Sequence, residues 1–116
     1  MSEKLEVLQT AYDYIARLEP GIQTCVENFQ IGNLAKAHED LVLIIDGIDW
    51  LMQALTLTQD IHKDQIILDT VREALPELLE GIQNNDTILI ADILQYEILE
   101  GVQSWKEGIA INLVEN

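Results

Sequence analysis

The chain has 116 residues, of which 48% are apolar, so it is long enough for one domain with a single hydrophobic core and too apolar for disorder. Its formal net charge of -15 would repel nucleic acid and anionic membrane surfaces, and its longest apolar run, 41–45, is far shorter than a membrane span. We expect a soluble, cytoplasmic, single domain over residues 1–116 that binds neither nucleic acid nor membranes, since the N-terminus lacks the basic and then apolar order of a secretory signal.

The first predicted helix covers about residues 2–30. Ser2 can accept hydrogen bonds from the free amides of the first turn, and apolar residues then recur at spacings of three and four. Glu19 interrupts this apolar stripe, although the neighbouring Leu18 can fill the same layer. Pro20 removes a backbone donor and clashes with the preceding turn, so we expect a kink there or two abutting helices. The unchanged phase of the stripe favours the kink.

The second predicted helix, about 33–58, follows a turn in which Gly32 ends one helix and Asn33 caps the next. Within 41–45 this helix is apolar on every side, and such a helix must be covered on every side. Gly47 lowers the stability of the helix by about 1 kcal/mol relative to alanine, which is tolerable if a neighbouring helix approaches closely there. We expect the other helices to pack around this one.

Two further helices are predicted in the second half, one over about 60–82 with a kink at Pro76 and one over about 87–112. A polar turn separates them, and Asp86 or Thr87 caps the last helix. The apolar stripe of the last helix has one polar exception, Gln95, and consists of Ile88, Ala91, Ile98, Val102, Trp105 and Ile109.

Four helices of similar length joined by short turns predict an all-α fold, an up-and-down antiparallel four-helix bundle. The two halves are also alike, because each has a proline-containing helix, a polar turn and a second helix with excess apolar surface. Ala37 and Gly47 have counterparts 54 residues later in Ala91 and Gly101. The bundle would then consist of two pseudo-repeated helical hairpins.

The sequence contains no set of residues at a catalytic or metal-binding spacing. Bundles that hold paired metals place Glu three residues before His, whereas Ala35 and Gln59 precede His38 and His62 at that spacing. Cys25 is the only cysteine, so it can form no internal disulfide, and we expect it to be buried in the first helix. We predict no catalytic residue, no metal and no cofactor.

One alternative stays open, namely a carboxylate-based metal or small-molecule site inside the bundle, which could be enzymatic. It would require buried Asp or Glu side chains that converge with His38 or His62. The acidic candidates, which the helical spacing places at outer or flanking positions, are Asp46, Asp49, Asp92, Glu97 and Glu100.

The main functional indication is that the second and fourth helices carry more apolar residues than one buried stripe needs. Trp105 lies on the core stripe, whereas Trp50 lies on a flank, where it is either an anchor for a partner or a packed edge. We predict a non-enzymatic adaptor or chaperone-like protein that binds a protein partner or amphipathic helix, and we expect a homodimer. The predicted partner-binding residues are Val42, Leu43, Trp50, Leu89, Ile90 and Ile93.

The segment NDTILIADILQYEI, residues 85–98, followed by Trp105, resembles a family of small, acidic, uncharacterised bacterial helical proteins, some of them linked to motility genes. In size, acidity and helicity the chain is also similar to flagellar export chaperones. The resemblance implies a bacterial cytoplasmic helical protein and provides no catalytic residue.

Overall fold

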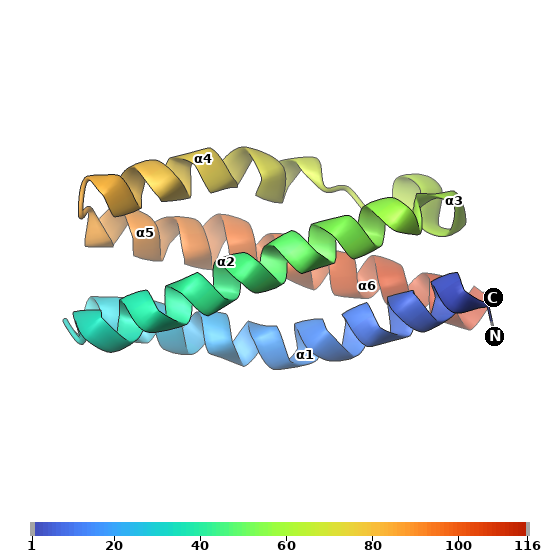
Figure 1. The fold of residues 1–116 in the computed structure, drawn as a ribbon, viewed down its shortest axis with the longest axis horizontal. Coiled ribbons are helices and arrows are strands. Elements are labelled where there is room, and N and C mark those ends of the chain that lie inside the picture. Colours follow the sequence, from blue (N-terminus) through green and yellow to red (C-terminus); the bar gives the residue numbers. More distant parts are fainter. Residues whose placement is uncertain (1, 116) are drawn as a thin grey trace.

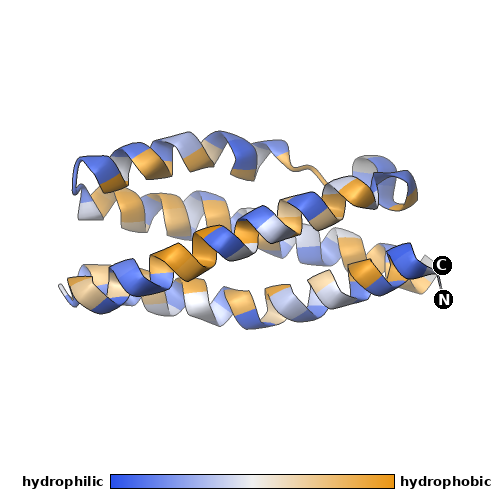
Figure 2. Cartoon of the chain, in the orientation of Figure 1, coloured by the Kyte–Doolittle hydropathy of each residue, from blue (hydrophilic) through white to orange (hydrophobic). Residues whose placement is uncertain are grey.

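The computed structural model describes residues 2–115, apart from the side chains at positions 64 and 115. Every regular element within these residues is helical and no strand occurs among them, so the prediction of an all-α fold is confirmed. The long helices lie along the longest axis of a molecule that measures 45 × 22 × 18 Å (Figure 1). Figure 2 shows that the strongly hydrophobic residues are not confined to the inner sides of the helices, because some lie on the outward face of the second one.

The first helix, α1 (Glu3–Gln30), is continuous through Pro20. Ser2 Oγ accepts a hydrogen bond of 3.2 Å from the Leu5 amide, which confirms Ser2 as the N-cap. Leu18 is buried and fills the layer that Glu19 interrupts, as expected. Pro20 lies on the exposed side of α1, where water can satisfy the carbonyl group that has lost its amide partner. The proline therefore does not divide the helix in two.

The second helix, α2 (Leu34–Leu57), begins after Gly32, whose φ of 81° is the left-handed conformation that ends helices. Asn33 stands at the N-cap, although its side chain makes no capping hydrogen bond. Gly47 is buried against Tyr14 of α1. The close approach of a neighbouring helix, which the sequence led us to expect at this glycine, is confirmed.

The segment predicted as the start of a third long helix is an irregular crossover. It contains a single turn, α3 (Gln59–His62), a 3-10 turn, η1 (Lys63–Gln65), and an extended Ile66. The long helix α4 (Asp69–Gln83) begins only after this crossover and is continuous through Pro76. The predicted helix over 60–82 is therefore wrong in its first part and correct in its second.

Hydrogen bonds to buried side chains hold the crossover in its irregular path. His62 is buried, and its Nε2 lies 2.7 Å from the Leu55 carbonyl oxygen. Trp105 is also buried, and its indole Nε1 donates to the Ile67 carbonyl oxygen at 2.8 Å. These bonds satisfy carbonyl groups that have no helical partner, and the second joins residues 38 positions apart, too far in sequence for apolar spacing to reveal.

The last helical stretch contains a π-helical turn that shifts its buried face. The helix α5 (Thr87–Ile93) passes into the π-helix η2 (Leu94–Ile98) and then into α6 (Leu99–Glu115). A π turn accommodates one extra residue, so the residues before it are rotated by about 100° relative to a regular α-helix. Ile88 is consequently 76% exposed, although it was expected in the core stripe. The stripe predicted after the π turn is correct.

The packing is centred on α1. This helix lies along α2 on one side and along α5, η2 and α6 on the other, while α4 packs on α5 and η2. In contrast, α2 and α4 hardly touch each other, so one side of the molecule is left open between them. The helix expected to be covered on every side, α2, is therefore covered only in part.

Glycines at equivalent positions of the two halves allow close contacts between helices. A Cβ at Gly47 would overlap Tyr14 of α1, and a Cβ at Gly101 would overlap Val71 of α4. These contacts join α1 to α2 and α4 to α6, so the second helix of each half carries a glycine where the first helix of that half approaches.

Candidate protein-binding surface

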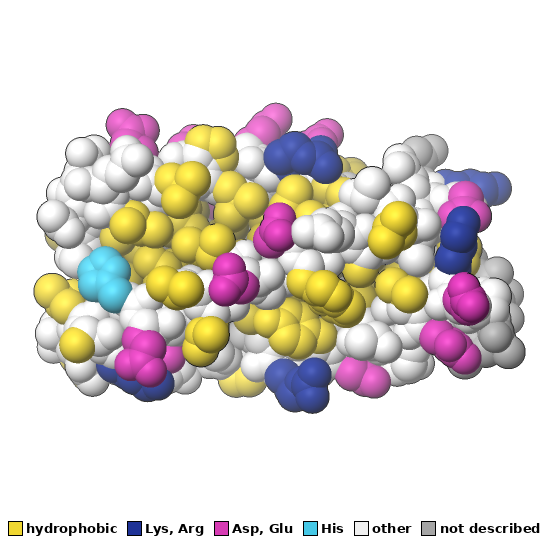
Figure 3. All heavy atoms as spheres, in the orientation of Figure 1, with side chains coloured by type: hydrophobic (Ala, Val, Ile, Leu, Met, Phe, Trp, Pro, Cys, Tyr) yellow, Lys and Arg dark blue, Asp and Glu magenta, His cyan; other side chains and the backbone are white. Residues whose placement is uncertain are grey.

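Apolar side chains line the open side between α2 and α4, where Figure 3 shows them gathered over both helices. Asp49 and Met52 of α2 line a hollow together with Arg72 of α4, so this side of α2 faces α4. Residues three, four or seven positions from these share the same side of their helix. The surface that they form, which we call the α2–α4 trough, consists of Val42, Ile45 and Met52 of α2 and Leu75, Leu79 and Ile82 of α4.

The trough is in part exposed to solvent. Val42 is 60% exposed and Leu79 is 52% exposed, while the other four residues of the trough are half-buried. Each Å² of apolar surface removed from water contributes about 25 cal/mol of favourable free energy, so an exposed apolar surface of this kind favours association.

The helices that border the trough are acidic. Exposed positions of α4 carry the carboxylates of Glu73, Glu77 and Glu80. The only basic residue of α4, Arg72, forms an ion pair of 2.9 Å with Asp69 and is therefore already neutralised. The electrostatic potential around the trough is therefore negative.

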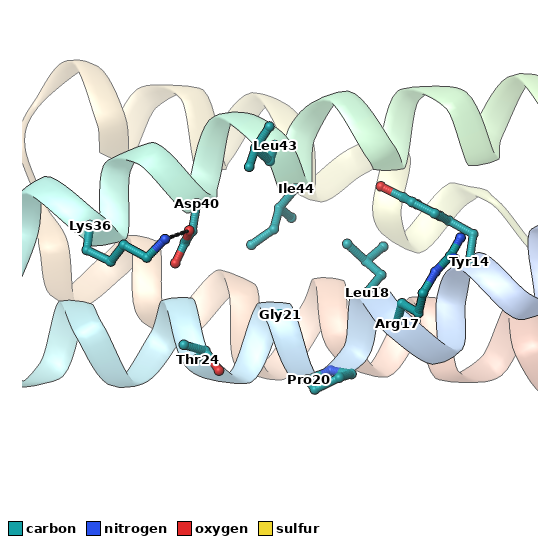
Figure 4. A pocket seen from close by; sticks show the side chains of 10 residues that line it. All are labelled: Tyr14, Arg17, Leu18, Pro20, Gly21, Thr24, Lys36, Asp40, Leu43 and Ile44. Atoms are coloured by element: carbon teal, nitrogen blue, oxygen red, sulfur yellow. Dashed lines mark ion pairs between the residues drawn. The ribbon is translucent and has the colours of Figure 1, made fainter.

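A second exposed apolar surface lies on the other side of α2, against α1. Two adjoining hollows of about 610 and 460 Å³ share Tyr14, Arg17 and Leu43, and Figure 4 shows the smaller one. Trp50 lines the larger hollow, and its ring meets that of Tyr14 edge-on with 5.7 Å between the ring centres. Leu43 is 64% exposed and Trp50 is 41% exposed. We call this surface, formed by Tyr14, Arg17, Leu43, Asp46 and Trp50, the α1–α2 groove.

The charges of the α1–α2 groove balance one another. Lys36 and Asp40 form an ion pair of 3.0 Å at one end, drawn as a dashed line in Figure 4. The Arg17 guanidinium lies 5.9 Å from the centre of the Tyr14 ring. Within the described part of the chain, neither Arg17 nor Asp46 forms an ion pair. The groove is thus a neutral area on an acidic molecule.

A family model for a domain of unknown function, DUF8042, matches residues 6–108. The chain belongs to the DUF8042 family. This membership agrees with the resemblance to an uncharacterised family, because the segment that carries the resemblance, 85–98, lies inside the matched region. Comparison with curated proteins and with solved structures finds no significant match.

The predicted partner-binding residues of the DUF8042 domain do not form one face. Val42 lies in the α2–α4 trough, whereas Leu43 and Trp50 lie in the α1–α2 groove. Leu89 is 37% exposed and lies beside Gly81 of α4. The exposed apolar surface of α2 is therefore divided between its two flanks.

Two of the predicted residues require correction. Ile90 and Ile93 are buried in the core, so neither contributes to an exposed surface of the monomer. The π turn η2 is the physical reason, since it rotates α5 relative to α6 and directs these two side chains inward. Arg17 and Leu79 were not predicted, because Arg17 is not apolar and Leu79 lies outside the two helices with excess apolar residues.

The titratable side chains considered for a metal or buried carboxylate site lie apart from one another in the part of the domain that the structure describes. No group of three or more His, Cys, Asp or Glu side chains is placed there to hold a metal ion. His38 is half-buried, and its ring meets that of Phe29 edge-on at 5.1 Å. The acidic residues considered for a buried site, listed above for the second and fourth helices, are exposed or half-buried. Among residues 2–115, no helix is both long and apolar enough to cross a membrane.

Proposed function

We propose that this DUF8042 domain is a non-enzymatic protein-binding module, an adaptor or chaperone-like protein, that receives an amphipathic helix in the α2–α4 trough. One observation carries the proposal: α2 and α4 both present apolar side chains to the side on which they hardly touch each other. A helix laid in the trough would bury Val42 and Leu79, the two most exposed of its residues.

We also propose that the helices form an up-and-down antiparallel four-helix bundle whose α2–α4 side is left open. Its four members would be α1, α2, α4 and the stretch from α5 through α6. The short turns after α1 and after α4 support antiparallel neighbours, and the packing of α1 on both α2 and α6 supports this order of helices. The partner helix would complete the open side.

The partner helix would be basic. Lysine or arginine residues beside its apolar face would meet the carboxylate of Asp49 on α2, and the exposed carboxylates of Glu73, Glu77 and Glu80 on the outer side of α4 would add a longer-range attraction. An acidic helix of the same shape would be repelled by the net charge of -15. Charge would therefore select the partner, while the apolar contacts supply most of the affinity.

A synthetic helix tests this function directly. The probe is a peptide of about 18 residues with leucine at helical spacing and lysine elsewhere, which spans about 27 Å when helical. We expect it to bind the domain, to gain helicity on binding, and to bind more weakly at high salt. A peptide of the same composition, with leucine and lysine in an order that gives no apolar helix face, is the control.

Matched variants locate the binding surface. Val42→Glu and Leu79→Glu place a charge in the trough and should weaken binding of the peptide about tenfold or more. Ile111→Glu changes a residue of α6 that is 46% exposed and should leave binding unchanged. Equal losses in all three variants, or equal binding of the control peptide, would contradict the proposal.

A further inference from the structure

We infer that the α1–α2 groove is the interface through which two copies of this chain form a twofold-symmetric dimer. This inference concerns the flank of α2 opposite the trough and does not depend on the proposed binding of a partner helix. It rests on the charge, the symmetry and the exposed aromatic and aliphatic side chains of the groove.

Charge favours a second copy over a basic partner in this groove. Each copy has a net charge of -15, so two copies repel each other unless they meet through a surface that is not acidic. The groove provides such a surface, because Arg17 of α1 faces Asp46 of α2 across it, and Lys36 and Asp40 of α2 form an ion pair at one end. Arg17 and Lys36 are two of only six basic residues in the chain.

The groove is also complementary to itself. Arg17 lies on α1 and Asp46 lies on α2, on opposite walls of the same hollow, and neither has an ion-pair partner within the described chain. In a twofold interface, a contact from one residue to a second is made twice. Arg17 of each copy can therefore pair with Asp46 of the partner subunit.

Apolar contacts accompany this pairing. Leu43 and Trp50 are seven residues apart on α2, which places them on one side of the helix about two turns apart, with Asp46 between them. A twofold axis near Asp46 brings Leu43 of one copy against Trp50 of the partner subunit. Tryptophan, tyrosine and arginine are the residue types that contribute most to protein interfaces, and the groove contains all three.

Mixing two charge-reversal variants provides the decisive experiment. In a dimer of the Arg17→Glu variant, the new glutamate of each copy faces Asp46 of the partner subunit. In a dimer of the Asp46→Arg variant, the new arginine of each copy faces Arg17 of the partner subunit. Each variant should dimerise about tenfold or more weakly than the natural chain, as measured by sedimentation at protein concentrations from about 1 to 100 µM. A mixture of the two variants restores both ion pairs and should form a heterodimer.

The controls separate this interface from general electrostatics. Lys63→Glu changes the net charge by the same amount as Arg17→Glu at an exposed residue outside the groove, and it should leave the dimer intact. Leu43→Glu should abolish the dimer while circular dichroism shows an unchanged helical content. A natural chain that stays monomeric at about 100 µM, or a mixture of variants that does not associate, would overturn the inference.

Discussion

Tyr14 of α1 lies directly over Gly47 of α2, where a Cβ would overlap its hydroxyl group and lie 2.9 Å from its ring carbon Cζ. Replacement of a helical glycine by alanine ordinarily stabilises a helix by about 1 kcal/mol. At Gly47 we expect the opposite, a loss of about 1 to 3 kcal/mol in the free energy of unfolding, because the Tyr14 ring must leave its position between the helices. Urea denaturation of Gly47→Ala measures this.

Gly21 provides the matched control for Gly47. It also lies inside a helix, α1, but a Cβ at this position would meet nothing within 4 Å. Gly21→Ala should therefore raise the free energy of unfolding, by at most about 1 kcal/mol. If both substitutions change stability in the same direction and by the same amount, the close contact at Gly47 is not what determines its effect.

The ion pair between Lys106 and Glu19 joins α6 to α1 in a partly buried setting. Lys106 Nζ lies 3.1 Å from Glu19 Oε1, a buried oxygen atom that no aligned hydrogen bond satisfies, so charge neutralisation depends on this lysine. Lys106→Met should leave the partly buried carboxylate without a counter-charge and lower the free energy of unfolding, measured by urea denaturation, by about 1 to 3 kcal/mol.

A solvent-exposed pair is the control for Lys106. Lys4 Nζ lies 2.8 Å from Asp60 Oδ2, and both side chains are more than half exposed. Lys4→Met should change the free energy of unfolding, measured in the same way, very little, since solvent screens this pair. Equal losses in Lys4→Met and Lys106→Met would show that burial of Glu19 does not matter.

The π turn η2 predicts opposite outcomes for two single-residue deletions. Removal of the exposed Tyr96 takes out the extra residue of the turn, so α5 and α6 become one regular helix and both keep their buried faces. Removal of the exposed Ser104 instead rotates Trp105 and all later residues by about 100°. Thermal unfolding should show a midpoint within about 5 °C of the natural chain for the first deletion and a fall of more than about 10 °C for the second. Comparable falls in both would contradict the π-helical assignment.

Cys25 should be inert while the domain is folded. Its side chain is buried, and its Sγ donates to the Ala37 carbonyl oxygen at 3.3 Å. Burial, with a smaller effect from the nearby Asp40 carboxylate, raises the pKa of the thiol to about 12. At pH 8 the reactive thiolate is then only about one part in ten thousand, so iodoacetamide should label Cys25 only when the chain unfolds. Labelling in buffer at the rate of a free thiol would contradict this.

Local signals in the sequence predicted much of the fold. The cap at Ser2 and the left-handed conformation of Gly32 depend on neighbouring residues, so both were predicted correctly. The crossover before α4 was not predicted, because it is held by a bond from Trp105 to the distant Ile67 carbonyl group. The π turn was also missed, since the apolar spacing was interpreted on the assumption of a regular α-helix.

The candidate surfaces were also predicted only in part, because local signals identify some of their residues but not the helices that lie beside them. Val42, Leu43 and Trp50 lie on a helix with more apolar residues than one stripe requires, and all three are exposed. The residues that complete these surfaces, Arg17 and Leu79, lie on helices that the sequence did not single out. Leu79 is nevertheless an apolar residue next to the buried Leu78 and outside the buried stripe of its helix. Which helices border the exposed residues depends on packing, and the sequence alone does not supply it.

Methyl NMR of the domain during titration with the leucine and lysine peptide tests the open side between α2 and α4 most directly. The expected result is that the methyl groups of Val42, Leu75 and Leu79 shift together, while those of Leu43 and Ile111 stay in place. If the methyl groups of the α2–α4 trough stay unchanged at saturating peptide, or if the shifts centre on Leu43, then the trough is not where an amphipathic helix binds.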